Sequence, residues 1–130
     1  MTKGSLRHIA LAVPDKEAAA QFYEETFGFK RMSQSVVATR LSDGVMNLTL
    51  LQFRNQEDAG DERGPNFVGL HHFGIWVDDL DETKRAIEAH GGHYHPAPGG
   101  HTPANAEHKF RDPNGTVFDV STHGWDGAQR

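Results

Sequence analysis

Two histidines open matching segments of this chain, and a histidine can bind a metal ion or carry a proton near neutral pH. The first segment runs from His8 to Val13, and the second runs from His72 to Val77, 64 residues later along the chain. Both segments continue with mostly apolar residues, which is typical of a buried strand. A polar side chain repeated at the same position of two strands is the geometry from which one shared site can be built.

The repeat extends beyond the histidines. Gly28 has its counterpart in Gly92 at the same offset, and the segment Asn47-Leu48-Thr49 has its counterpart in Asp119-Val120-Ser121. The same order of similar pieces in both halves indicates a duplicated structural unit. Because a unit of roughly 60 residues is a marginal fold by itself, we expect the two halves to share one core or sheet.

Each half is predicted to contain one strand, one helix and three further strands. Apolar residues at alternate positions indicate the strands, and a helical spacing of apolar residues between Asp15 and Gly28 indicates the first helix. In the first half we expect a strand over 6–13, a helix over 16–26, and strands over 30–33, 36–41 and 45–53. In the second half we expect a strand over 69–77, a helix over 80–90, and strands over 93–97, 106–111 and 116–122.

Together these elements predict an α+β fold of two βαβββ modules, one over residues 5–53 and one over residues 69–123. The segment between them, residues 54–68, is polar and charged and contains Gly and Pro. It is therefore predicted to be a linker, with a mobile lid as the alternative. The length of 130 residues is that of one domain.

The alternation of each strand also assigns its faces. Phe118 and Val120 are expected in the core, so Asp119 between them points to the opposite face. The same argument places four polar residues on faces away from the core: His8, Asn47, His72 and Asp119. If the two halves curl toward each other, two imidazoles and one carboxylate meet and form a ligand set for Fe(II), Mn, Ni or Zn. In the alternative interpretation, the histidines are hydrogen-bonded structural residues.

Other side chains are candidates for binding a substrate. An amide oxygen is a weak ligand for these metals, so Asn47 is predicted to line the pocket and to bind the substrate by hydrogen bonds. Trp76 is a further candidate for the pocket wall, and Phe53 and Arg40 are others. These three could hold an aromatic or anionic substrate, or could instead serve packing or lie at the surface.

Composition narrows the classes of function. The net charge of −5 argues against nucleic acid, because binding to phosphates needs clustered Lys and Arg. The chain has no cysteine, which excludes disulfides, thiolate nucleophiles and zinc–thiolate sites. No apolar run is long enough for a membrane span, and no secretory signal is recognisable. We therefore expect a cytoplasmic protein that binds a small molecule, without a nucleic acid or membrane partner.

The segment from His8 to Val13, followed by Ala19, Phe22-Tyr23 and Phe27-Gly28-Phe29, resembles the N-terminal pattern of glyoxalase I. The segment from Gly69 to Gly74 resembles the second motif of that family. Over about residues 6–122 the chain is similar to the vicinal-oxygen-chelate superfamily, which includes glyoxalase I, bleomycin-resistance proteins, methylmalonyl-CoA epimerases and extradiol dioxygenases. The resemblance implies a single domain over residues 1–130, with a curved mixed sheet around a cleft.

In this superfamily the strands that open and close each module supply the metal ligands. Carried over by position, the resemblance implies ligands at His8, His72 and Asp119, with Asn47 at the fourth position. Glyoxalase I normally has Glu or Gln where Asn47 stands and Glu where Asp119 stands. An amide cannot take up a proton, so Asp119 is the candidate catalytic base among the four.

The leading hypothesis is a glyoxalase-like lyase or isomerase. One divalent ion, Fe, Ni, Zn or Mn, would be held by His8, His72 and Asp119, would bind vicinal oxygens of a small substrate and would stabilise an enediolate-like intermediate. A different class of function is a metal-free protein that sequesters an antibiotic, similar to the bleomycin-resistance members. A homodimer is also expected, because superfamily members of this length commonly dimerise.

An Fe(II) dioxygenase that cleaves a catechol-like ring is a further alternative. Gly99, His101 and the run from His108 to Asp119 have the spacing of the extradiol dioxygenase signature. In that family the histidine at the position of His101 assists acid–base chemistry, so His101 is a catalytic candidate and His108 is a candidate for substrate binding. Lys109 stands where that family usually has Tyr, and Asp119 stands where it usually has Glu.

Overall fold

The computed structural model describes residues 3–60, 62–95 and 107–130. These residues form one eight-stranded mixed sheet with the strand order β2-β3-β4-β1-β5-β8-β7-β6. The strands are β1 (Gly4–Ala12), β2 (Lys30–Gln34), β3 (Ala38–Ser42), β4 (Asn47–Leu51), β5 (Gly69–Val77), β6 (His93–Tyr94), β7 (His108–Arg111) and β8 (Val117–Ser121). The helices are α1 (Lys16–Phe27), α2 (Gln56–Ala59) and α3 (Leu80–Ala89).

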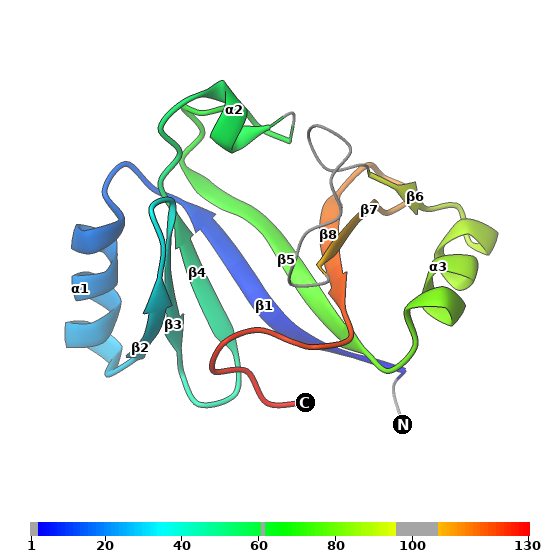
Figure 1. Ribbon diagram of the computed structural model, residues 1–130, viewed down its shortest axis with the longest axis horizontal. Helices are drawn as coiled ribbons and strands as arrows, with labels where there is room; N and C mark the ends of the chain where they lie inside the picture. The colour runs from blue at the N-terminus through cyan, green and yellow to red at the C-terminus, as the bar shows by residue number, and fades with distance from the viewer. Residues whose placement is uncertain (1–2, 61, 96–106) are drawn as a thin grey trace.

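The order of elements repeats along the chain. A first run of β1, α1, β2, β3 and β4 is followed by a second run of β5, α3, β6, β7 and β8, and the short α2 lies between them. Figure 1 shows α1 and α3 at opposite ends of the curved sheet, with α2 above its middle. The predicted α+β fold with a curved mixed sheet is confirmed.

The two halves meet in the middle of the sheet. There β1 and β5 run antiparallel, from the pair Gly4 and Val77 to the pair Ala12 and Gly69. On either side, β4 pairs with β1 in parallel and β8 pairs with β5 in parallel. The strands that open and close both halves are therefore four neighbours in one sheet, which brings their side chains close together.

Each long helix packs against the apolar face of its own half. Ala20 of α1 contacts Leu41 and Leu50, with partly buried neighbours such as Tyr23 and Leu48 around them. In the second half, Leu80 and Ile87 of α3 pack against four buried residues: Val77, Phe110, Phe118 and Val120. The core positions predicted for β8 are thus confirmed. The other face of the central strands remains for polar residues.

Side-chain caps explain where the helices begin. The carboxylate of Asp15 accepts hydrogen bonds from the N–H groups of Glu17 and Ala18 and begins α1. Gly28 ends this helix in a left-handed conformation with φ of 74°, which glycine adopts at no steric cost. Asp79 caps α3 in the same way, by accepting from the N–H group of Glu82. Both helices lie where the sequence predicts them.

Several strands differ from the sequence prediction in their bounds, and two differences have a visible cause. The strand expected from residue 45 begins at Asn47, because the carboxylate of Asp43 accepts hydrogen bonds from the N–H groups of Val45 and Met46 and keeps both in the turn. The expected linker contains the unpredicted helix α2, whose first turn is capped by Asn55. Among the described residues, no helix has both the length and the apolar character that a bilayer-spanning helix needs.

Candidate metal centre

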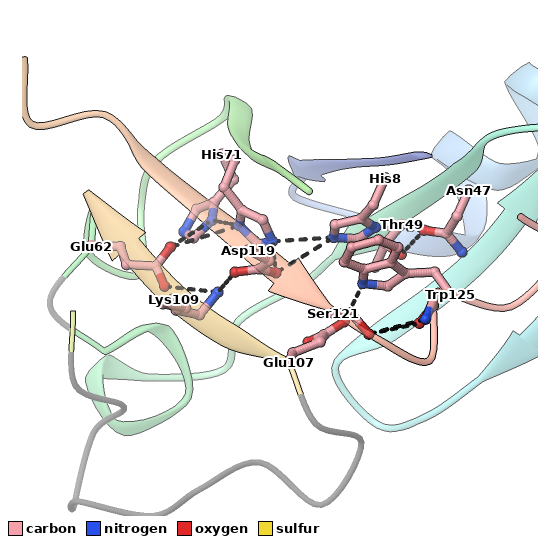
Figure 2. A network of polar contacts seen from close by, with 12 residues as sticks. His8, Asn47, Thr49, Glu62, His71, Glu107, Lys109, Asp119, Ser121 and Trp125 are labelled. Atoms are coloured by element: carbon pink, nitrogen blue, oxygen red, sulfur yellow. Dashed lines mark hydrogen bonds and ion pairs between the residues drawn. The ribbon is translucent and has the colours of Figure 1, made fainter. Parts of the chain in front are cut away.

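Three side chains from three strands converge on one point. The atoms His8 Nε2 and His72 Nε2 lie 3.2 Å apart, and Asp119 Oδ2 lies 3.0 Å from His72 Nε2 and 3.8 Å from His8 Nε2. All three side chains are buried. Figure 2 shows the His8 ring and the Asp119 carboxylate directed toward each other. The two histidines that open the halves therefore meet within one chain.

The sheet register produces this convergence. Ala10 of β1 pairs with His72 of β5, His8 pairs with Gly74, and Gly74 in turn pairs with Asp119 of β8. Paired residues project to the same face of a sheet, so the three polar side chains share the face opposite the two helix-covered clusters. Gly74 lies between His8 and Asp119 and has no side chain that would separate them.

The three atoms fit a divalent cation. Ligand atoms about 2.1 Å from one ion lie roughly 3 to 3.5 Å from one another, and the separations in this cluster are close to that range. Asp119 Oδ2 is buried and receives no hydrogen bond of acceptable geometry, although His72 Nε2 lies near it. Leaving a buried carboxylate oxygen without a partner is costly, and a cation among the three atoms would supply one. The nitrogen and oxygen donors suit Fe(II), Mn, Ni or Zn.

Asn47 fixes the orientation of the His8 ring. Asn47 Nδ2 donates to the backbone carbonyl of Asp126 at 2.8 Å, so Asn47 Oδ1 faces the ring at 2.7 Å from His8 Nδ1. Since an amide oxygen can only accept, His8 Nδ1 carries the proton and donates it. The hydroxyl of Thr49 donates to the same oxygen at 2.7 Å. His8 Nε2 is therefore left with a lone pair that is directed at the cluster, as metal-binding histidines require.

The His72 ring is held by different neighbours. His72 Nδ1 lies 2.7 Å from His71 Nδ1, and Glu62 Oε2 lies 3.7 Å from His72 Nδ1 and 3.1 Å from His71 Nδ1. The two Nδ1 atoms share one proton, and a proton on His72 Nδ1 that is donated to His71 would leave His72 Nε2 with the lone pair that a cation needs. Glu62 comes from the segment between the two halves, so this segment reaches into the site.

Lys109 joins the two carboxylates of the site. Its Nζ atom lies 2.7 Å from Asp119 Oδ1 and 3.1 Å from Glu62 Oε1. Burial alone would lower the pKa of the Lys109 ammonium, but Asp119 and Glu62 outweigh burial and raise it. Burial alone would raise the pKa of the Asp119 carboxyl, but His72 and Lys109 hold it below its ordinary value. Both groups are therefore charged at neutral pH.

Burial keeps the neighbouring histidines neutral. Loss of hydration is the largest cause that lowers the pKa of His8 to about 4, and repulsion from His72 adds to it. Burial likewise lowers the pKa of His71 to about 4, against the opposing effect of Glu62. A neutral imidazole has a nitrogen lone pair available, so at neutral pH His8 is in the form that binds a cation.

A cavity with a volume of about 270 Å³ opens beside the three converging side chains. This is the scale of a site for a small molecule. His8 and His72 form part of its wall, and the apolar part consists mainly of Val37, Leu51, Phe53 and Ala59. The charged or ionisable side chains of the wall, besides the histidines, are Arg40, Asp58, Glu62, Glu107 and Lys109. Phe53 and Arg40, two candidates from the sequence, therefore do line the cavity.

The C-terminal segment contributes Trp125 to the same wall. Its indole ring stacks on His8, with ring centroids 4.8 Å apart and an interplanar angle of 4°. A Cβ atom on Gly74 would lie 2.6 Å from the indole ring, so the stack requires glycine there. The indole N–H of Trp125 donates a hydrogen bond to Glu107. Burial, with added repulsion from Asp119, raises the pKa of the Glu107 carboxyl.

Comparison with known proteins identifies the family. The model of the glyoxalase/bleomycin resistance protein/dioxygenase superfamily matches residues 5–120. The chain belongs to this superfamily. The resemblance that rests on the two histidine segments is thereby confirmed, and the shared fold accounts for four site-bearing strands at the centre of one sheet.

Methylmalonyl-CoA epimerases are among the superfamily members similar to this chain. Human mitochondrial methylmalonyl-CoA epimerase is 34% identical over 86 residues, with 60% of this chain and 49% of that protein covered. The chain thus spans about half the length of this relative. A Streptomyces coelicolor methylmalonyl-CoA epimerase variant, solved with 2-nitronate-propionyl-CoA, matches with a TM-score of 0.69 at 22% identity and covers 88% of this chain and 94% of its own.

A metal-bound superfamily member also shares the fold. The Mn(II)-bound glyoxalase from Novosphingobium aromaticivorans matches with a TM-score of 0.67 at 18% identity, covering 96% of this chain and 40% of its own. At these low identities the two solved structures establish a common fold. The reaction of this chain has to be argued from its own residues.

Two predicted substrate-binding residues lie outside the cavity wall. Asn47 pairs directly with His8 in the sheet, so its amide meets the ring instead of the cavity. Trp76 donates its indole N–H to the carbonyl of Thr122 at 3.2 Å, and its ring lies against Gly124. The C-terminal segment therefore covers Trp76. In this structure Asn47 contacts a histidine and Trp76 contacts the chain end, and their role in substrate binding stays a prediction.

His108, a further substrate-binding candidate, also lies outside the cavity wall. Lys109 pairs with Asp119 across β7 and β8, and the side chains of the two residues meet. Successive residues of a strand project to opposite faces, so His108 faces away from the cavity and is absent from its wall. Lys109 lines the cavity, and the substrate-binding role of His108 stays a prediction. His101, the other catalytic candidate, lies outside the described residues.

Four residues of the site were not singled out from the sequence: Glu62, Glu107, Lys109 and Trp125. For two of them a signal existed, because the core position of Phe110 places Lys109 and Glu107 on the opposite face by strand alternation. Glu62 and Trp125 lie outside the repeated strands, and no periodic pattern points to them.

Proposed function

We propose that this protein is a divalent-metal-dependent enzyme that moves a proton at a carbon next to a carbonyl group of a small substrate. The observation that carries the proposal is the convergence of His8, His72 and Asp119, whose ligand atoms lie within 4.8 Å of one another around a buried carboxylate oxygen. The similarity to methylmalonyl-CoA epimerases and to a Mn(II)-bound glyoxalase supports this class of reaction.

The ion would be held by His8 Nε2, His72 Nε2 and a carboxylate oxygen of Asp119, and Fe, Ni, Zn and Mn all suit these ligands. When bound, a divalent ion supplies Lewis acidity, which withdraws electron density from vicinal substrate oxygens. The Lys109 ammonium adds positive charge beside Asp119, at 2.7 Å from its other oxygen. This charge favours a substrate that becomes more negative during the reaction.

Glu107 is the group proposed to accept and return the proton. It lines the cavity, and burial together with the charge of Asp119 raises the pKa of its carboxyl, which brings that pKa closer to the working pH of a general acid–base group. The indole N–H of Trp125 orients it. Asp119 is then a ligand and not the base, because it is fully buried, holds Lys109 and has a lowered pKa.

The test is proton exchange with solvent. Protein stripped with a chelator and reloaded with Mn(II), Ni(II) or Zn(II) is incubated in D₂O with methylmalonyl-CoA, or with the hemithioacetal of methylglyoxal and glutathione, and exchange is followed by NMR. We expect metal-dependent loss of the proton next to the carbonyl with at least one of the two substrates. Glu107→Gln should bind the metal normally and slow the exchange by about 100-fold or more.

Two results would contradict the proposal. One is a protein that binds no divalent ion, because a metal-free sequestering protein would then be the better account. The other is a metal-loaded protein without exchange on either substrate. The expected homodimer stays a prediction, which light scattering of the purified protein checks.

A second candidate function is favoured by the ligand set itself. Two histidines and one carboxylate with open positions also suit Fe(II) and oxygen activation. The protein would be reconstituted anaerobically with Fe(II), mixed with catechol, and oxygen uptake would be recorded. Rapid uptake with ring cleavage would establish the dioxygenase, and the isomerase proposal predicts none.

A further inference from the structure

We propose that Arg40 binds a carboxylate of the substrate, so that the enzyme selects molecules with metal-binding oxygens at one end and an anionic group at the other. This inference rests on the proposed function, because it requires the metal centre as the first anchor. To the reaction proposed above it adds a substrate class, namely small molecules that carry a free carboxylate.

The sheet places Arg40 across the cavity from the metal centre. Arg40 of β3 pairs with Thr49 of β4, and Thr49 pairs with Ala10 of β1. All three residues line the cavity together with His8. Neighbouring strands are about 4.8 Å apart, so the backbone of Arg40 lies roughly 10 Å from that of β1. Arg40 Nη1 contacts Ser33 of β2, on the side of β3 away from β1, so the guanidinium is directed away from His8 and the cavity lies between them.

Arg40 is a cation without an anionic partner in the described part of the chain. Its single hydrogen bond to a side chain is a contact of 3.5 Å with the hydroxyl of Ser33, at the limit of what counts as a bond. The other cationic side chain of the cavity wall, Lys109, already holds two carboxylates. Arg40 therefore retains the capacity to bind an anion.

The acids of the cavity wall have their own partners and leave Arg40 unneutralised. Asp58 is paired with Arg54 at 2.7 Å, and Glu62 is paired with Lys109 at 3.1 Å. Ala38 and Leu51, the next pair along β3 and β4, give the wall beside Arg40 an apolar part, while Ser33 on its other side donates to Asp126. A guanidinium binds a carboxylate through two parallel hydrogen bonds, and such a pair is stronger where apolar walls reduce access of water.

The charge of the metal centre leads to the same class of ligand. A divalent ion with two neutral histidines and one carboxylate has a net charge of +1, and Arg40 adds a second positive charge to the cavity. A neutral substrate would leave both charges without compensation inside a partly buried site. A molecule with an anionic end and metal-binding oxygens would compensate both.

The experiment compares two hydroxamates, which bind a metal through two vicinal oxygens. Acetohydroxamate has no further charge, whereas succinohydroxamate carries a carboxylate at its other end. Affinities of both probes for the metal-loaded protein are measured by calorimetry, for the wild type, Arg40→Gln and Arg40→Lys. We expect succinohydroxamate to bind the wild type about 10- to 100-fold more tightly than acetohydroxamate, as a charge-assisted bidentate pair would provide.

The variants assign the gain to Arg40. In Arg40→Gln the preference for succinohydroxamate should disappear, while the affinity for acetohydroxamate, which also reports an intact site, stays unchanged. In Arg40→Lys a part of the preference should remain, because the charge is kept and the bidentate geometry is lost. If Arg40→Gln does not fold, the wild-type ratio and Arg40→Lys still decide the question.

Failure of this inference is distinguishable from failure of the proposed function. Equal affinity of the wild type for both probes, or a preference that survives in Arg40→Gln, would overturn the role of Arg40 and leave the metal centre intact. If neither probe binds, or if the protein takes up no metal, the metal centre itself is overturned and the inference with it.

Discussion

The two halves of the sheet hold matching histidines by different chemistry. In the first half, His8 donates to the neutral amide of Asn47, and its ring stacks on Trp125. In the second half, the surroundings of the His72 ring include three charged residues: Asp119, Glu62 and Lys109. The first half therefore orients its histidine with a neutral amide and an aromatic ring, and the second half orients its histidine with an ionic network.

The register of the sheet adds a second difference. Asn47 pairs directly with His8, whereas Asp119 pairs with Gly74, two residues beyond His72. Asn47 consequently meets the Nδ1 edge of its own ring, and Asp119 reaches the space that both rings share. Duplication thus accounts for the two histidines, while the residues of the two closing strands have separate roles: Asn47 orients a histidine, and Asp119 is a proposed metal ligand.

The largest expected effect follows from changing the carboxylate of the second half. Asp119→Asn removes a charged ligand and also leaves Lys109 with one buried partner fewer. We expect the affinity for Mn(II) or Zn(II) to fall by about 100- to 1000-fold, since each of a few ligands provides a comparable share of the binding free energy. Isothermal titration calorimetry measures the loss. Glu88→Gln, an exposed carboxylate of α3, is the control and should bind as the wild type does.

Lys109→Met breaks the ionic network of the second half and leaves all three proposed metal ligands in place. Asp119 and Glu62 then lose the cation between them, and removing one partner of a buried pair costs about 3 to 5 kcal/mol. The free energy of unfolding of the metal-free protein, measured in urea, should fall by that amount. Added metal should restore part of it, because a cation again faces Asp119. Lys30→Met on the exposed edge strand should change little, and equal losses in both variants would refute the network.

Asn47→Leu tests the neutral half. The leucine keeps the volume but cannot accept the His8 N–H, so the ring loses its fixed tautomer. We expect metal affinity to fall by about 10- to 100-fold, as for other residues that orient a ligand. NMR of the His8 ring nitrogens is the readout that a merely structural role would not move. A ring that keeps its proton on Nδ1 in the variant would contradict the role of Asn47.

Glu62→Gln is the matched change in the charged half, with a smaller expected effect. The amide keeps the shape of the side chain and removes its charge, while His71 remains beside His72. Metal affinity should fall by about 10-fold, and the ring nitrogens of His72 should shift while those of His8 stay in place. An effect on both rings would show that the two halves are not oriented independently.

The central site residues were accessible to sequence reasoning because they obey simple periodic rules. The equal spacing of the two histidine segments, and the alternation of Phe118, Asp119 and Val120, place the three proposed ligands on one face. The same alternation around Phe110 would have selected Lys109 over His108. The residue type favours His108 as a site residue, whereas the strand period favours Lys109.

Other parts of the site could not be found in this way. Glu62 reaches His72 from an irregular segment, and the position of such a segment depends on contacts between distant parts of the chain. Trp125 lies beyond the last repeated strand, and its stack on His8 depends on space above Gly74. Register is equally invisible in a single strand, so the pairing of Asn47 with His8 emerges only from the assembled sheet.

The most direct test of the account is a crystal of the protein grown with Mn(II) or Zn(II), with anomalous scattering recorded at the edge of that metal. We expect one strong peak per chain, bonded to His8 Nε2, His72 Nε2 and a carboxylate oxygen of Asp119. No peak among these three side chains, or a single peak bound elsewhere, for example at Glu62 and His71, would contradict the proposal that the two halves share one metal ion.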